Sequence, residues 1–230
     1  KSIMCLTSSK WNNTMNTIQD IRNKFLELKS QNKIAENGTY EIVNAHFVCD
    51  ENVIFGSLNT EYAKHELAWY ESMSLNVNDI PGKVPAIWKQ VATPDGFINS
   101  NYGWCIFSEE NCFQYKNTIE SLKNDKYSRQ GQMIYTRPSM HTDWNSEGKH
   151  DFICTTNVSL LIRENKLIYT VNMRSNDAVF GFKNDLFWHQ YVYEKAFNEL
   201  KETYPELERT DIVWFANSLH VYSRHFDLIV

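Results

Sequence analysis

Two β-rich runs joined by the turn-like stretch RENK constrain the fold of this chain more than any other feature. The runs extend over residues 152–173, and their composition is typical of a β-hairpin, although Asn and Thr side chains interrupt the apolar pattern. A hairpin pairs neighbouring strands antiparallel. Helical and strand patterns elsewhere do not alternate as repeated βαβ units, so the sequence predicts an α+β protein and not a doubly wound one.

Four further segments have apolar residues at helical spacing, about every three or four positions. The patterns predict helices over 14–30, 59–72, 108–122 and 185–200, strands over 40–48, 132–136 and 211–222, and a polar loop over 139–151. Ser108 is expected to open the third helix. The buried stripe of that helix is expected to be Cys112, Tyr115, Ile119 and Leu122.

The composition narrows the class of protein. The 230 residues are 42% hydrophobic, and neither a linker nor a repeat divides them, so residues 1–230 are predicted to be a single domain. A net charge of −5 argues against a broad surface for a nucleic-acid polymer. Five cysteines without a C-x-x-C pair favour the reducing cytoplasm, and no metal site is expected. No apolar run approaches the ~18 residues that cross a membrane.

Cys154 is the first candidate for chemistry, because it lies in DFICTTNV among polar neighbours. A free cysteine more often packs as a small hydrophobe. A nucleophilic role requires nearby positive charge that favours the thiolate. Arg174 and Ser175, across the hairpin in NMRSND, are candidates to supply it.

Other polar residues suit a nucleotide. Arg129 and Arg174 each adjoin a serine, and such a pair offers a phosphate one charged guanidinium group and one neutral hydroxyl donor. An ordinary surface arginine would look the same in the sequence. His220 and Tyr222 share one face of the last strand, where they suit either a sugar hydroxyl or a core pair.

Two acids have unusual positions. Glu66 lies on the aromatic side of the second helix, and Asp185, in VFGFKNDLFW, lies at the expected start of the last one. By its position alone, Asp185 is more simply a helix N-cap than a ligand-binding residue.

Taken together, five segments resemble the signature segments of the thymidylate synthase superfamily. They are KHELAWY, NSNYGW, DFICTTN, RSNDAVFGFKND and SLHVYSRH, and the similarity extends from about residue 45 onward. Within the superfamily, IYTRPSM, VNMRSND and VYSRHF look most like the deoxycytidylate hydroxymethylases of tailed phages. The resemblance implies a mixed β-sheet packed with helices, in a homodimer that associates through the sheet and shares its active sites between two chains.

The resemblance also implies a reaction, the transfer of a one-carbon unit from 5,10-methylenetetrahydrofolate to C5 of a pyrimidine nucleotide. Cys154 matches the nucleophile that adds to C6, which makes C5 reactive. Glu66 matches a glutamate that organises water and proton transfer, and enclosure should raise its pKa. Tyr102 matches a tyrosine near C5 that is implicated in proton removal.

The binding residues follow from the same matches. Arg174 and Ser175 match the phosphate-binding pair of one protomer, and Arg129 matches an arginine that reaches across the dimer interface. The remaining matches are His220 and Tyr222 for the sugar 3′-hydroxyl, and Asp177 and Trp88 for the folate. Four positions depart from the synthase pattern, namely Gln130, Ile153, Thr155 and Val91.

The position of Asp185 is an asparagine in the thymidylate synthases, where the amide suits uracil. Cytosine presents an amino donor at C4 and an acceptor at N3, so a carboxylate that shares one proton with N3 suits it better. The resemblance therefore implies dCMP as substrate, with 5-hydroxymethyl-dCMP and tetrahydrofolate as products. No single residue decides between a hydroxymethyl and a methyl product, and dUMP, a ribonucleotide or a non-catalytic nucleotide-binding role remain alternatives.

Overall fold

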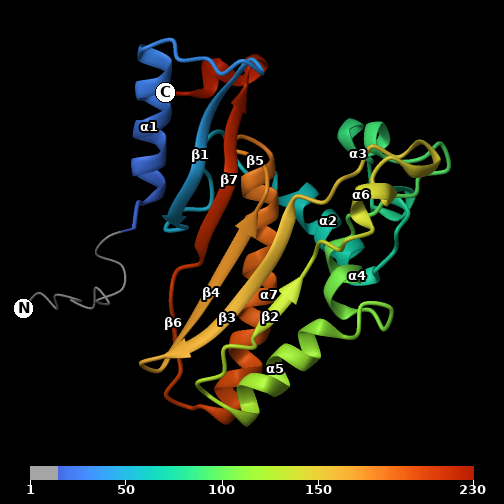
Figure 1. Cartoon of the computed structure of the whole chain (residues 1–230), viewed down its shortest axis with the longest axis vertical. Helices are drawn as coiled ribbons and strands as arrows, with labels where there is room; N and C mark the ends of the chain where they lie inside the picture. Colours follow the sequence, from blue (N-terminus) through green and yellow to red (C-terminus); the bar gives the residue numbers. More distant parts are fainter. Residues whose placement is uncertain (1–14) are drawn as a thin grey trace, which may run out of the picture.

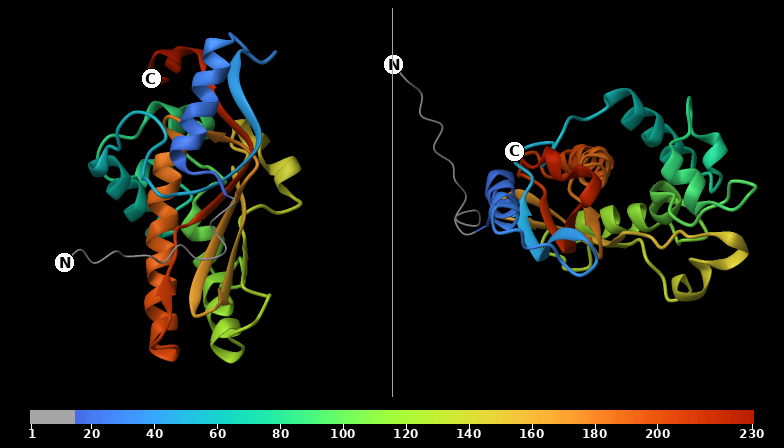
Figure 2. Two further views of the ribbon diagram at one scale, coloured as in Figure 1. Left: turned by 90° about the vertical axis from the view of Figure 1, so that its left-hand side faces the viewer. Right: turned by 90° about the horizontal axis from the view of Figure 1, so that it is seen from above.

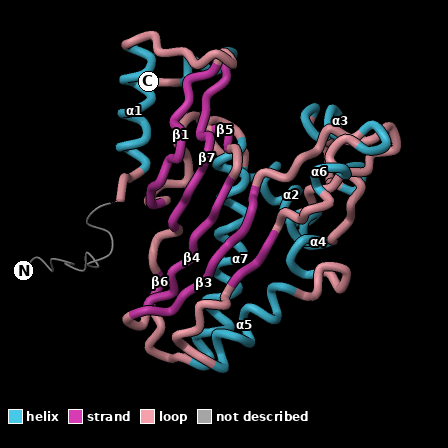
Figure 3. The backbone as a smooth tube through the Cα atoms, in the orientation of Figure 1, coloured by secondary structure: helices cyan, strands magenta, loops and turns pink. Residues whose placement is uncertain are grey.

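A mixed seven-stranded sheet forms the centre of the computed structural model, which describes residues 15–230. The strands are β1 (Thr39–Val48), β2 (Gln132–Ile134), β3 (Thr155–Arg163), β4 (Lys166–Met173), β5 (Asn176–Asp177), β6 (Glu208–Arg209) and β7 (Val213–Tyr222). The main order is β1-β7-β4-β3-β2 (Figures 1 and 3). β3 and β4 form the predicted antiparallel hairpin, whereas β4 runs parallel to β7, and the two short strands β5 and β6 run parallel to β7 and β4. The α+β prediction is confirmed.

Seven α-helices accompany the sheet in the described part of the chain. They are α1 (Ile18–Ser30), α2 (Thr60–Ser72), α3 (Ala86–Val91), α4 (Tyr102–Phe107), α5 (Gln114–Asn124), α6 (Met140–Asp143) and α7 (Gly181–Thr203), with 3₁₀ turns at Val77–Asp79, Ser146–Gly148 and Ser223–Leu228. The predicted loop over 139–151 is wrong in part, since it contains α6 and a 3₁₀ turn. Between residues 15 and 230, none of these helices combines the length and apolar character that a bilayer-crossing segment needs.

The hairpin has two different faces, which explains why polar residues interrupt its apolar pattern. Along β4, Leu167, Tyr169, Val171 and Met173 are buried, and the residues between them are half-buried. On this buried face the hydroxyl of Tyr169 lies 3.1 Å from Nδ1 of His189 on α7, and α7 runs along one side of the sheet in both views of Figure 2. Thr170 and Asn172 belong to the other face, which α5 and α7 leave uncovered.

The predicted helix over 108–122 is wrong at its start. Ser108 ends α4, and α5 begins only at Gln114. Cys112 and Phe113 have left-handed backbone angles, with φ of 61° and 47°, so the helix cannot continue through them. Cys112 is exposed and does not belong to the buried stripe. That stripe consists of Tyr115, Thr118, Ile119 and Leu122.

The last helix starts earlier than its pattern predicts. α7 begins at Gly181, which puts Asp185 in its second turn. The turn before the helix is formed by Asp177, whose carboxylate accepts from the backbone N–H groups of Val179 at 2.9 Å and Phe180 at 3.4 Å. The prediction that the helix opens at Asp185 is therefore wrong, and so is the alternative that Asp185 is its N-cap.

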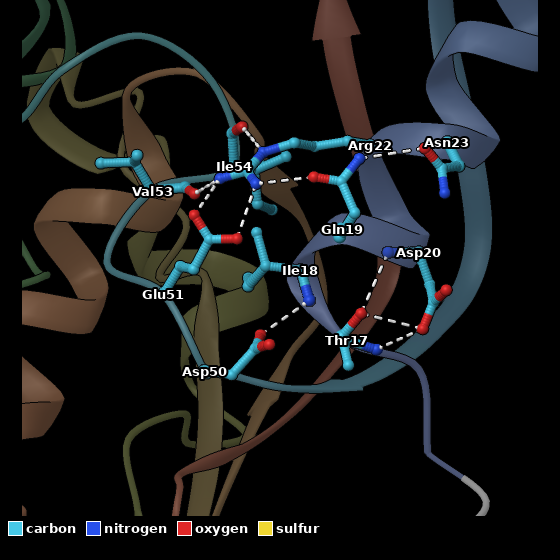
Figure 4. Close-up of polar contacts among 10 residues, drawn as sticks. All are labelled: Thr17, Ile18, Gln19, Asp20, Arg22, Asn23, Asp50, Glu51, Val53 and Ile54. Atoms are coloured by element: carbon cyan, nitrogen blue, oxygen red, sulfur yellow. Dashed lines mark hydrogen bonds and ion pairs between the residues drawn. The ribbon is translucent and has the colours of Figure 1, made fainter.

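The first helix is fixed to the segment after β1 (Figure 4). α1 begins at Ile18 after an N-cap, Thr17, while residue 14, the predicted start, lies outside the described residues. Asp50 accepts from the backbone N–H of Ile18 at 2.9 Å. Arg22 binds both carboxylate oxygens of Glu51 at 2.7 Å and donates to the carbonyls of residues 53 and 54. We call Asp50, Glu51 and Arg22 the α1 clasp.

Candidate active site

The hairpin brings Cys154 and Arg174 together at one end of the sheet. Cys154 immediately precedes β3, and Arg174 immediately follows β4. The backbone N–H of Arg174 donates to the carbonyl of Cys154 at 2.9 Å, and Nη2 of Arg174 lies 3.7 Å from Sγ. The predicted proximity of positive charge to this thiol is confirmed.

Arg174 is held against the strand that carries the thiol. Its Nε donates to the carbonyl of Ile153 at 2.8 Å, its Nη2 donates to the carbonyl of Phe152, and its guanidinium lies 4.7 Å from the ring centre of Phe152. Burial nevertheless raises the pKa of Cys154 to about 11, because Arg174 offsets it only in part and the charge of Asp185 adds to it. The thiol is therefore protonated at neutral pH, so the arginine alone does not generate the thiolate.

Glu66 is enclosed, as the sequence predicts. It faces inward from α2 and is 6% exposed. Tyr62 donates to its Oε1, and Nε1 of Trp88 lies 3.0 Å from the same oxygen. Burial raises the pKa of Glu66, while the hydrogen bonds from Tyr62 and Trp88 lower it. The predicted direction of the pKa shift is confirmed.

Asp185 projects from α7 into the same enclosed region. Its Oδ2 accepts from Nδ2 of Asn176 at 2.8 Å, and Tyr102 is a second donor to the carboxyl group. Burial, and then the negative charge of Glu66, raise the pKa of Asp185 to about 8. The carboxyl group is therefore mostly protonated at neutral pH.

Tyr102 is positioned by tight packing of α4 against α2. The buried side chain of Asn101 caps α4 by accepting from the N–H of Trp104 at 2.8 Å. A Cβ atom at Gly103 would lie 1.8 Å from the carbonyl oxygen of Tyr70, so only glycine permits this approach. The ring of Tyr102 consequently stacks on that of Tyr70, with centroids 5.2 Å apart. Burial, together with the charge of Asp185, raises the pKa of Tyr102.

A further acid, the buried Asp151, shapes the segment that leads into α4. It accepts from the backbone N–H of Asn99 at 2.6 Å and from the hydroxyl of Ser100 at 2.5 Å. Burial raises its pKa, and the bonds to Ser100 and Asn99 oppose that shift. Asp151 thus connects the segment before Cys154 to the segment before Tyr102.

The ends of β5 and β7 contribute the residues that were matched to the sugar and the folate. Asp177 pairs with His220 in parallel register. The rings of His220 and Tyr222 lie 4.8 Å apart, which agrees with the predicted shared environment. Burial raises the pKa of Tyr222, and the charges that act on it belong to Asp177, Arg224, Cys154 and Arg174. Ser175 lies between the ends of β4 and β5, in the same region.

Arg129 is not among the residues that the single chain brings together. It is exposed in the connection from α5 to β2, in a groove lined by Asn124, Tyr127, Ser128 and Gln130 among others. This connection lies at the opposite end of the sheet from the start of β3 (Figure 1).

Three residues of the site, Tyr62, Asn176 and Asp151, were not singled out for a role. Tyr62 carried a usable signal, since it precedes Glu66 by four residues on one helix face. The contacts of Asp151 and Asn176 depend on partners 52 and 9 residues away, and no local pattern indicates them. Within residues 15–230, no three His, Cys, Asp or Glu side chains are grouped so as to hold a metal ion.

Comparison with known proteins identifies the family of this chain. The family model described as thymidylate synthase matches residues 29–230. The chain belongs to the thymidylate synthase family. Deoxycytidylate 5-hydroxymethyltransferases of Enterobacteria phages T6 and T4 are each 49% identical over 219 residues, or 93% of this chain and 89% of the relative.

More distant members of the family share less of the sequence. A thymidylate synthase of Francisella tularensis is 22% identical over 175 residues, which are 72% of this chain and 62% of that enzyme. Thermostable thymidylate synthase A from Bacillus subtilis superposes with a TM-score of 0.67 at 20% identity, covering 93% of this chain and 83% of that one. The predicted thymidylate synthase fold is confirmed.

Proposed function

We propose that this protein transfers a one-carbon unit from 5,10-methylenetetrahydrofolate to C5 of dCMP, with addition of water, to give 5-hydroxymethyl-dCMP and tetrahydrofolate. The observation that carries the choice of dCMP is Asp185, a partly buried carboxyl group whose pKa of about 8 keeps it mostly protonated at neutral pH. The 49% identity to phage deoxycytidylate 5-hydroxymethyltransferases supports the same reaction.

Asp185 is proposed to read the base. A protonated carboxyl group offers one O–H donor and further acceptor positions. Cytosine needs a donor for N3 and an acceptor for its C4 amino group, which the acid supplies together. Uracil carries a hydrogen on N3 and has no basic nitrogen there to take up the proton of the acid, so an O–H···N3 bond that passes into proton transfer is available to cytosine alone. Sharing the proton with N3 would also draw electrons from C6 and favour attack there.

Cys154 is proposed to be the nucleophile that adds to C6. Its thiol is 3.7 Å from Nη2 of Arg174, so the positive charge stabilises sulfur as it gives up its proton during attack. Adduct formation makes C5 electron-rich enough to take the one-carbon unit. Glu66, which is enclosed, is proposed to position water at the ring, and Tyr102, whose phenol stays protonated, to orient the water that removes the C5 proton.

The phosphate is proposed to be bound from two chains. Arg174 uses Nε and Nη2 for its backbone contacts, which leaves Nη1 for a phosphate oxygen next to Ser175. Arg129, remote and exposed in one chain, would complete the site from a second protomer. His220 and Tyr222 are proposed to bind the sugar 3′-hydroxyl.

A homodimer through the sheet would bring Arg129 to the partner's site. The uncovered face of the sheet carries exposed apolar side chains, with Ile134 at 56% and Val43 at 67%. An apolar sheet face of this kind is expected to be covered by another protein surface. The proposed occupant is a second copy of this chain.

The folate supplies the one-carbon unit when it is bound, and the residues present suit it. The ring of Phe180 is half exposed beside Asp177, and Oδ1 of Asn176 is a buried acceptor without a partner in the described part of the chain. A pterin ring offers N–H donors that would satisfy such an acceptor. Asp177 and Trp88 are proposed to hold the folate. We further propose that the enzyme acts in the cytoplasm of the bacterium that a phage infects.

Release of tritium from C5 tests this function. With methylenetetrahydrofolate present, [5-³H]dCMP should release its tritium to water at a rate far above that of [5-³H]dUMP. Faster release from the uracil nucleotide would reject dCMP as the substrate.

A further inference from the structure

The two carboxylate oxygens of Glu66 are used unequally. The Tyr62 hydroxyl and Nε1 of Trp88 both contact Oε1, the latter at 3.0 Å. Oε2 accepts from no donor in residues 15–230. A carboxylate anchored through one oxygen can direct the other toward a ligand.

Tyr62 is well placed to act as a permanent donor. It precedes Glu66 by four residues on α2, so the two side chains lie on one face of that helix. Its hydroxyl is itself 3.0 Å from Nε1 of Trp88. Burial, followed by the charge of Glu66, raises the pKa of Tyr62 far above its ordinary value. The phenol therefore keeps its proton at any pH at which an enzyme works.

The titratable groups whose charges couple to Glu66 are tyrosines and an acid. Tyr62 and Tyr70 belong to α2, and Asp185 belongs to α7. Arg174, the cation of the site, acts on Cys154 instead. The hydrogen bonds from Tyr62 and Trp88 favour the charged form of Glu66, whereas burial opposes it. Loss of the Tyr62 donor should therefore raise the pKa of Glu66 further.

We propose that Tyr62 is a positioning residue for the reaction: with Trp88 it holds Oε1 of Glu66, so that Oε2 faces the bound base and its water. This inference rests on the proposed function and adds to it a residue that acts through Glu66. The phenol fixes the side-chain rotamer and stabilises the ionised form. A Glu66 without this donor would be both more mobile and more readily protonated.

The test compares Tyr62→Phe with Tyr191→Phe in the full chain. The hydroxyl of Tyr191 donates to Glu71, on the same helix α2, at 2.6 Å, but this pair is exposed to solvent and lies outside the site. Each substitution thus removes one hydrogen bond from a tyrosine hydroxyl to a glutamate of α2. For each, kcat and the KM for dCMP are measured between pH 5.5 and 9, with thermal melting as the check on folding.

Tyr62→Phe should lower kcat about tenfold or more and change the KM for dCMP less than threefold. On the acid side of the profile of kcat against pH, the fall in kcat should occur at higher pH than in the wild type, because Glu66 must be ionised to act. We call this side the acid limb. Tyr191→Phe should leave kcat and the limb unchanged. If Tyr62→Phe does not fold, Trp88→Phe removes the other donor to the same oxygen and should move the limb in the same direction.

An unmoved acid limb in the folded Tyr62 variant would overturn the inference, and so would an equal loss of kcat in the Tyr191 variant. Failure of the proposed function gives a different result. In that case the wild-type chain itself does not convert dCMP, whereas failure of this inference leaves wild-type turnover intact.

Discussion

The α1 clasp and the active-site acids show two opposite uses of charge. In the clasp, Arg22 binds Glu51 at 2.7 Å through both carboxylate oxygens, and this partnership lowers the pKa of Glu51. In the site, Glu66 is buried and Asp185 is partly buried, both carboxyl groups are hydrogen-bonded to neutral donors, and their pKa values are raised. The clasp therefore contributes to stability. The site retains acids whose charged forms are unfavourable, and that cost is what makes them able to exchange protons with a ligand.

The largest effect is expected from Cys154→Ala. In this variant kcat should fall by at least about four orders of magnitude, because no adduct forms at C6. Binding of dCMP should still be detected by calorimetry. Cys112→Ala is the matched control, since this thiol is exposed and outside the site. Retained turnover in the Cys154 variant would show that another group attacks the ring.

Asp185→Asn tests which base the site accepts. The amide removes the protonated acid, so the ratio of kcat/KM for dCMP to that for dUMP should fall by roughly 10²–10⁴-fold. Kinetics with both nucleotides under one folate concentration give the ratio. An unchanged ratio would mean that Asp185 does not read the base.

The same substitution should also change how stability depends on pH. The ordinary pKa of Asp185 is 3.8 and its folded value is about 8, so the folded state binds this proton more tightly. The stabilisation is complete below pH 3.8 and is lost as the pH rises through 8. Asp185→Asn avoids this loss. Its free energy of unfolding should exceed that of the wild type by roughly 2–4 kcal/mol at pH 8.5, with little difference at pH 4. Thermal melting across this range checks it, and a parallel pair of curves would contradict the raised pKa.

The smallest effect is expected in the clasp. Arg22→Ala should lower the free energy of unfolding by about 1–2 kcal/mol with kcat unchanged, since the bonds to Glu51 are partly exposed and those to carbonyls are better shielded. Arg209→Ala is the control, because this arginine also binds a glutamate, Glu194, but with both side chains about half exposed. Arg209→Ala should lower the free energy of unfolding by less than about 1 kcal/mol. A larger loss for Arg209 would reverse the order of the two pairs.

The sequence was sufficient for the parts of the fold that local patterns determine. The hairpin, the strand before α2 and the extent of α2 follow from periodicity. The start of α5 did not follow, because the left-handed backbone at Cys112 and Phe113 interrupts a stripe that looks continuous in the sequence. The start of α7 was missed because the turn that precedes it is made by Asp177, eight residues before Asp185.

The candidate site was predictable mainly through the family resemblance. Spacing alone would have left Asp185 as a cap and Cys154 as a core residue. The roles of Arg129 and of the sugar- and folate-binding residues stay predictions, since they depend on a second chain or on bound ligands. The single-domain prediction also stays a prediction. The sign of the shift at Cys154 could not be read from the sequence, because burial outweighs the nearby arginine only in three dimensions.

Mass spectrometry of the product reveals both the base that reacts and the group that is added. Incubation of the protein with dCMP and methylenetetrahydrofolate should yield 5-hydroxymethyl-dCMP with tetrahydrofolate, and incubation with dUMP should yield little product. Formation of a 5-methyl nucleotide with dihydrofolate, or efficient conversion of dUMP in place of dCMP, would contradict the account.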